Sequence, residues 1–81
     1  MSGQPVQIAT EQLKAAFADA QVEITGDGSH FDVLVVSDDF EGLRAVKKQQ
    51  LVYAVLNDQI SSGAMQAVNM KLFTKAEWAA Q

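Results

Sequence analysis

Apolar residues recur at helical spacing near the start of the chain. They fall at positions i, i+3, i+4 and i+7, which places them on one face of a helix: Leu13, Ala16, Phe17 and Ala20. Residues 1–8 before this face are largely polar and contain the single proline, Pro5. The pattern predicts a flexible N-terminal tail over residues 1–8 and a first helix that begins near Thr10.

The spacing then changes from helical to alternating. Val22 and Ile24 alternate with polar residues, which predicts a half-buried strand. A dense turn signal, Gly26-Asp27-Gly28-Ser29, follows and predicts a hairpin. Residues 31–36 read FDVLVV and are apolar on both faces, so we expect them to form the central strand of the sheet.

Helical spacing returns over residues 43–60, where the apolar positions include Val52, Val55 and Leu56. The periodicity leaves open whether this segment is one helix or two. Gly63 is positioned to end it.

The last part of the chain predicts one strand and one short helix. Residues 67–72 alternate between apolar and polar positions, as in a third strand. Thr74 and Glu77 form a T-x-x-E capping box at the start of a helix that contains Trp78. The predicted order is α-β-β-α(α)-β-α, an α+β domain over residues 9–81 with one three-stranded sheet covered by helices on one face.

Composition narrows the possible functions. The chain has 81 residues, 48% of them hydrophobic, and no cysteine, which excludes disulfides, thiolate metal sites and thiol nucleophiles. We expect a cytoplasmic protein, because the start of the chain lacks the features of a signal peptide and no apolar run approaches the length of a membrane span. The net charge of −4 opposes non-specific binding to nucleic acid and to anionic lipid, so no membrane partner is expected.

His30 is the only histidine and follows the glycine-rich turn at the start of a strand. It is a candidate metal ligand, or a hydrogen-bonded or exposed loop residue. One imidazole without cysteine cannot complete a metal site. If His30 binds a metal, the remaining ligands must therefore come from another molecule.

Basic residues concentrate at one place. Arg44, Lys47 and Lys48 stand at i, i+3 and i+4, on one predicted helix face. This stripe could contact phosphates of nucleic acid, dock an acidic protein surface, or form a solvated helix face.

Carboxylates concentrate just before the same segment, at Asp38, Asp39 and Glu41. No histidine or serine nucleophile accompanies them, so we interpret them as a surface cluster that compensates a helix dipole. Nucleophile, base and oxyanion donors do not converge in any motif, and we expect the protein not to be an enzyme.

Several separated motifs, in order, resemble the BolA family and in particular its IbaG-like branch. They are the loop GDGSHF at 26–31, FEG at 40–42, RAVKKQQ at 44–50 with VY at 52–53, and MKLFT-x-x-EW at 70–78. The resemblance covers residues 8–79. It implies an α-β-β-α-α-β-α fold similar to class II KH domains.

The resemblance also implies a partner, a monothiol glutaredoxin with a CGFS motif. In such complexes a [2Fe–2S] cluster is shared, with thiolates from the glutaredoxin and from glutathione, and the loop ligand of the BolA protein maps onto His30. The isolated chain is then expected to bind no cluster and to be a monomer or a weak homodimer. The first hypothesis is accordingly an adaptor in iron–sulfur and redox homeostasis, with the basic helix near the interface.

One departure from the family pattern concerns the second ligand. Where the family has a histidine before the last strand, this chain has Gln66, and an amide is a poor iron ligand. Three alternatives stay open: His30 is the only protein ligand from this side, the glutaredoxin docks without a cluster, or cluster handling is lost.

The resemblance implies a second role, in transcription and the stress response. The alternative hypothesis is a KH-like nucleic-acid-binding regulator in which Arg44, Lys47 and Lys48 contact DNA weakly. The Gly-x-x-Gly loop of KH domains is absent from the chain, which disfavours sequence-specific reading of nucleic acid.

Overall fold

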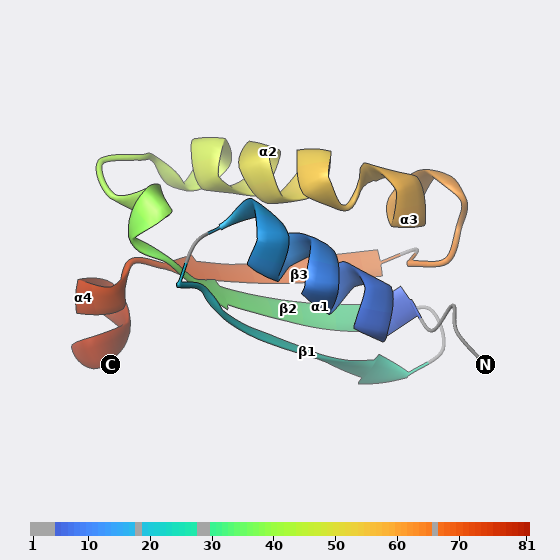
Figure 1. Ribbon diagram of the computed structural model, residues 1–81, viewed down its shortest axis with the longest axis horizontal. Coiled ribbons are helices and arrows are strands. Elements are labelled where there is room, and N and C mark those ends of the chain that lie inside the picture. Colours follow the sequence, from blue (N-terminus) through green and yellow to red (C-terminus); the bar gives the residue numbers. More distant parts are fainter. Residues whose placement is uncertain (1–4, 18, 28–29, 66) are drawn as a thin grey trace.

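The structure is a computed structural model that describes residues 5–17, 19–27, 30–65 and 67–81. The elements follow the predicted order: α1 (Pro5–Ala16), β1 (Gln21–Asp27), β2 (His30–Val36), the 3-10 helix η1 (Asp38–Phe40), α2 (Ala45–Val55), α3 (Asn57–Ser61), β3 (Ala67–Phe73) and α4 (Lys75–Ala79). The α+β fold with a three-stranded sheet is therefore confirmed (Figure 1).

The sheet has the strand order β1-β2-β3, which confirms β2 as the central strand. β1 and β2 are antiparallel, with Asp27 opposite His30 at the hairpin end. β2 and β3 are parallel, and their register runs from His30 opposite Ala67 to Val36 opposite Phe73. A parallel pair needs a long crossover, and α2 and α3 provide it.

The core lies between the sheet and the helices α1 and α2. Alternate residues of β2 are buried on this face: Phe31, Val33 and Val35. They belong to one cluster with buried residues of the helices and loops, which include Leu13, Phe17, Phe40, Val52, Leu56 and Met65. In Figure 1, α1 and α2 lie over the sheet, and α4 lies beyond the end where β2 and β3 finish.

Helix α1 begins at Pro5, one and a half turns before the predicted start near Thr10. Proline fits the first turn of a helix, because the amide hydrogen that it lacks would have no partner there. Val6 packs against the core and Ala9 is fully buried, so they extend the apolar face of Leu13 backwards. Residues 5–8 are therefore helical rather than part of a tail, and residues 1–4 lie outside the described residues.

The open question about residues 43–60 is settled in favour of two helices. α2 ends and α3 begins at Leu56, which is fully buried and has φ −93° and ψ 8°. Helical hydrogen bonds continue on both sides of the junction, from Leu56 to Val52 and from Ile60 to Leu56. Within the described ranges, no helix combines the length and the apolar character that crossing a bilayer requires.

Candidate functional sites at the two ends of the sheet

His30 is the first residue of β2 and is exposed. Because side chains alternate along a strand and its neighbour Phe31 is buried under the helices, the imidazole lies on the opposite, uncovered face of the sheet. A shallow hollow of about 220 Å³ adjoins it, lined by Asp32, Ala67 and Asn69 among others. Asn69 Nδ2 donates a hydrogen bond to Asp32 Oδ1 at 3.1 Å, across the strand pair.

Gly26 holds the hairpin close to His30. Its φ is +147°, and a Cβ at this position would overlap with the carbonyl oxygen of His30 and approach Phe31 Cα within 2.8 Å. Only glycine therefore lets β1 pass the start of β2 at this distance. The other turn residues that the sequence singled out, Gly28 and Ser29, lie outside the described residues.

The donor set at this end is small. Among the described residues, no group of three or more histidine, cysteine, aspartate or glutamate side chains could hold a metal ion. Ala67, opposite His30, begins β3, and the residue before it in sequence is Gln66, which lies outside the described residues. A metal ion bound at His30 would therefore need ligands from another molecule.

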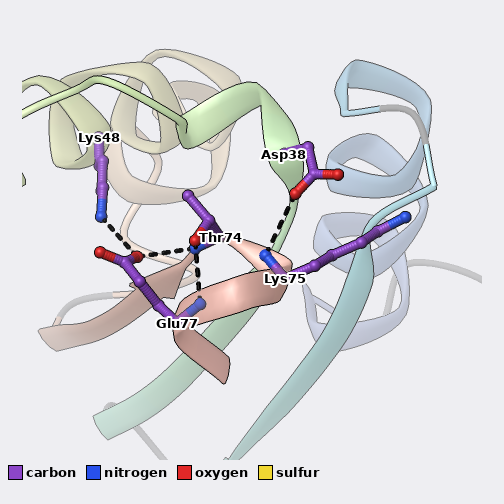
Figure 2. Close-up of polar contacts among 5 residues, drawn as sticks. All are labelled: Asp38, Lys48, Thr74, Lys75 and Glu77. Atoms are coloured by element: carbon purple, nitrogen blue, oxygen red, sulfur yellow. Dashed lines mark hydrogen bonds and ion pairs between the residues drawn. The ribbon is translucent and has the colours of Figure 1, made fainter. Parts of the chain in front are cut away.

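The three residues of the predicted basic stripe differ in exposure: two are exposed and one is buried. Arg44, the N-cap residue of α2, and Lys47 are exposed, as the prediction required. Lys48 instead is 8% exposed, and its Nζ lies 3.1 Å from Glu77 Oε1 of α4 (Figure 2). Lys48 therefore holds an element of its own chain, and the exposed cations of this helix face are Arg44 and Lys47.

Glu77 both caps the start of α4 and pairs with Lys48. The predicted capping box is confirmed, because Glu77 Oε1 accepts from the Thr74 N–H at 2.8 Å and the Thr74 hydroxyl accepts from the Glu77 N–H at 3.1 Å. The same oxygen accepts from Lys48. The hydrogen bond from the Thr74 backbone, and after it the one from Lys48, lower the pKa of Glu77.

Asp38 of the acidic cluster also makes a contact at this end of the sheet. Asp38 Oδ1 accepts from the Lys75 N–H at 3.3 Å, at the N-terminus of α4, and Figure 2 shows this contact beside the Lys48–Glu77 pair. Ser37 caps η1 by accepting from the Asp39 N–H at 3.1 Å. The helix whose N-terminus Asp38 compensates is therefore α4, 37 residues further on, and not the adjacent α2.

The two sets of predicted site residues lie at opposite ends of the sheet. His30 starts β2, whereas Lys48 lines a hollow with Phe73, at the last residue of β3. The six residue steps along β2 separate these ends by about 20 Å. In Figure 1 the hairpin end of β2 and the start of α2 lie on opposite sides of the molecule. The start of α2, with Arg44 and Lys47, therefore does not lie beside His30, where the resemblance places the cluster ligand.

A third feature was not anticipated from the sequence. The uncovered sheet face carries a hollow of about 340 Å³, lined by Glu23, Leu34, Lys71, Phe73 and Trp78 among others. Trp78 packs on Phe73 with a ring-centroid distance of 5.5 Å and stays partly exposed, as expected for a packing residue with a wet edge. In the sequence, the alternation of polar and apolar residues in β1 and β3 is the only local pattern that indicates this uncovered face of the sheet.

Comparisons with known proteins give a consistent result. The chain matches the family model of BolA-like proteins over residues 3–77. It is 45% identical over 67 residues to the acid stress protein IbaG of Escherichia coli K12, covering 83% of this chain and 80% of that protein. It is 39% identical over 56 residues to the DNA-binding transcriptional regulator BolA of Haemophilus influenzae, covering 69% of this chain and 53% of that protein.

Solved structures agree with the family match. BolA1 from Arabidopsis thaliana superposes with a TM-score of 0.84 at 26% identity, covering 94% of this chain and 98% of that one. The class defined by the fold, a small α+β domain with the order α-β-β-α-α-β-α and a three-stranded sheet, is thereby confirmed. The chain belongs to the BolA family, in its IbaG-like branch.

Proposed function

We propose that this BolA protein is a cytoplasmic adaptor that binds a monothiol glutaredoxin with a CGFS motif and takes part in iron–sulfur and redox homeostasis. His30 would be its ligand to a [2Fe–2S] cluster shared with the glutaredoxin cysteine and glutathione. The observation that carries this proposal is the position of His30, exposed at the hairpin end of β2 on the sheet face that α1 and α2 leave uncovered.

The chemistry of the donor set supports a shared site rather than a resident one. A neutral imidazole is a good nitrogen ligand for iron, and the chain contains no thiolate to join it. When bound, the cluster would supply one-electron chemistry. The residues of this chain would hold one ligand in place, with Gly26 allowing the close pairing of β1 and β2 that sets where His30 begins its strand.

The test is anaerobic reconstitution of the protein with a CGFS glutaredoxin, glutathione, iron and sulfide. We expect a heterocomplex on a sizing column and a visible circular dichroism spectrum that differs from that of the glutaredoxin alone. The variant His30→Ala should lose this spectral change. The matched control is Gln21→Ala, an exposed residue at the far end of the same sheet face, and it should behave as the wild type.

The variant Gln66→His and the behaviour of the complex without iron distinguish the alternatives for the cluster. If the missing second imidazole limits cluster binding, Gln66→His should strengthen the visible signal. If the glutaredoxin docks without a cluster, the complex should form without iron and should tolerate His30→Ala. An unchanged glutaredoxin spectrum together with no complex on the column would refute the adaptor proposal.

A nucleic-acid-binding regulator is the second candidate, favoured by the exposed Arg44 and Lys47 and by the relative named a DNA-binding transcriptional regulator. Since Lys48 is paired with Glu77, only two exposed cations remain on this helix face. Two phosphate contacts predict a slope of about −2 for the logarithm of affinity against the logarithm of salt concentration. Titration of duplex DNA at low salt tests this, with Lys47→Glu expected to abolish binding; no binding at low salt would exclude the role.

A further inference from the structure

β3 is an edge strand, because the sheet has the strand order β1-β2-β3. The Ser37 N–H donates to the Phe73 carbonyl at 2.9 Å, so the backbone groups of Phe73 point toward β2. In a parallel pair, alternate residues of a strand bond to the neighbouring strand. The N–H and C=O groups of Met70 and Leu72 therefore point to the free edge, where they form a template on which another extended chain can pair.

A groove runs along this edge, where α2 lies beside β3 (Figure 1). A hollow of about 290 Å³ is lined from both elements, by Ala45, Gln49, Met70 and Leu72 among others. A second hollow, of about 350 Å³, adjoins it at Leu72 and continues toward α4. We call the surface formed by these four residues the β3 groove. It places apolar side chains next to the free backbone groups of the edge.

The charge at the first hollow of the β3 groove is positive. Both charged residues that line it are lysines, Lys48 and Lys71. Lys48 is paired with Glu77. Lys71 is exposed and forms no ion pair within the described ranges. Carboxylates on an occupant would complement this lysine, although the chain as a whole has a net charge of −4.

We propose that the β3 groove binds an extended acidic segment of a partner protein, which adds to the sheet as a fourth strand antiparallel to β3. Main-chain hydrogen bonds to Met70 and Leu72 would hold the segment. Its side chains would alternate between the two faces of the sheet, so every second one would enter the hollow beside Ala45. The others would lie beside Lys71 on the uncovered face. The recognised pattern is therefore an alternation of apolar and acidic residues.

A peptide fits the β3 groove better than nucleic acid does. Nucleic acid is held mainly by phosphate contacts, and among the described cations that line the groove only Lys71 is unpaired. Nucleic acid also has no backbone amides with which to continue the ladder of β3. The first hollow of the groove shares no lining residue with the hollow beside His30. The proposal therefore goes beyond the glutaredoxin hypothesis and does not depend on it.

Nuclear magnetic resonance titration of the ¹⁵N-labelled full chain tests the proposal. The probe is the capped peptide acetyl-Val-Glu-Val-Glu-Val-amide, which matches residues 68–72 in length. Concentrations up to about 5 mM cover the weak affinity expected of a short added strand. We expect the peptide to shift the amides of Met70 and Leu72 and the side-chain amide of Gln49.

N-methylated peptides test the added strand directly. In the antiparallel orientation the residues opposite Met70 and Leu72 share their face, so the valine amides point toward β3 and the glutamate amides toward solvent. N-methylation of the valines should weaken binding at least about tenfold, because it removes the main-chain donors. N-methylation of the glutamates should have little effect. The reverse pattern would mean a parallel strand and would reject the proposed orientation.

Protein variants test the position of the site. Lys71→Glu should weaken binding about threefold and should favour acetyl-Val-Lys-Val-Lys-Val-amide instead, whereas Lys14→Glu makes the same change at an exposed position of α1 and should have no effect. Ala45→Trp should fill the hollow and abolish binding, and Ala54→Trp, at another exposed position of α2, should not. His30→Ala should bind the peptide as the wild type does, which separates this site from the cluster site.

Three results would overturn the proposal. If the peptide shifts no amide of β3 in the wild type, Lys71 only protects the edge from pairing. Equal weakening by both patterns of N-methylation would exclude an added strand. If a single-stranded oligonucleotide shifts the amides of Met70 and Leu72 and the peptide does not, the groove binds nucleic acid instead.

Discussion

The two ends of the sheet use their polar residues in different ways. At the end where β2 and β3 finish, Lys48, Glu77 and Asp38 bind one another or the N-terminus of α4 and hold that helix in place. At the hairpin end, His30 is exposed on the uncovered sheet face, and Gly26 allows the backbone of β1 to lie close to the carbonyl oxygen of His30. The comparison shows that a charged residue next to others in sequence can be structural: Lys48 is buried against Glu77, whereas Arg44 and Lys47 are exposed.

The largest effect on stability is expected at the hairpin end, for Gly26→Ala. A Cβ there overlaps with the His30 carbonyl, and φ is +147°, so we expect a loss of about 3 kcal/mol in the free energy of unfolding. Urea denaturation measures this loss. The control Gly42→Ala also has a positive φ, +79°, but nothing lies within 4 Å of its Cβ. It should cost about 1 kcal/mol. Equal costs would mean that the close approach of the strands does not matter.

At the opposite end, Thr74→Ala should have a smaller, local effect. The substitution removes the N-cap acceptor for the Glu77 N–H and should cost about 1 kcal/mol. Hydrogen exchange should show the loss as faster exchange of the α4 amides, with the β2 amides changed less. Ser61→Ala, at the end of α3, is a control hydroxyl whose hydrogen bond is exposed. If α4 exchanged no faster than in this control, the capping box would not hold the helix.

The acid dependence of stability should show the contribution of Glu77. Its pKa is lowered in the folded state, so its contribution is present above the ordinary value of 4.5 and is lost as the pH falls through the lower folded-state value. The difference in unfolding free energy between the wild type and Glu77→Gln should therefore shrink below pH 4.5. Urea melts across this range measure it. A difference that is independent of pH would exclude an ionised Glu77 as its source.

The smallest effect on stability is expected for His30→Ala. The side chain is exposed, so the free energy of unfolding should change by less than about 0.5 kcal/mol, even though the same variant should lose the cluster-dependent spectrum. Thermal and urea unfolding of the isolated variant measure this directly. A large loss of stability would assign His30 a structural role and remove the contrast between the two ends.

Local signals in the sequence were sufficient for much of the fold. The alternation of β1 and β3, the two-sided apolar run of β2 and the capping box of Thr74 and Glu77 were all predicted and confirmed. The start of α1 was missed, because a polar stretch with proline looks like a tail until Val6 and Ala9 are seen packed on the core.

The sites were less predictable, because their contacts join residues far apart in sequence. Lys48 looked equivalent to Arg44 and Lys47 on a helical projection, and only its partner, 29 residues away, distinguishes it. Of the acidic cluster, Asp38 contacts a helix N-terminus, but this helix is α4 and not the adjacent α2, since Asp38 accepts from the backbone of Lys75.

By itself, the sequence determined the helices and strands, their order and the presence of a single histidine. Local patterns are enough to specify helices and strands, because periodicity, capping and turn chemistry act over a few residues. The tertiary structure decided that the basic residues and His30 lie toward opposite ends of the sheet, which are about 20 Å apart along β2, and that Lys48 pairs with Glu77 of α4. The physical reason is that the parallel pairing of β2 with β3 brings the ends of distant segments together, and no local pattern specifies which side chains meet there.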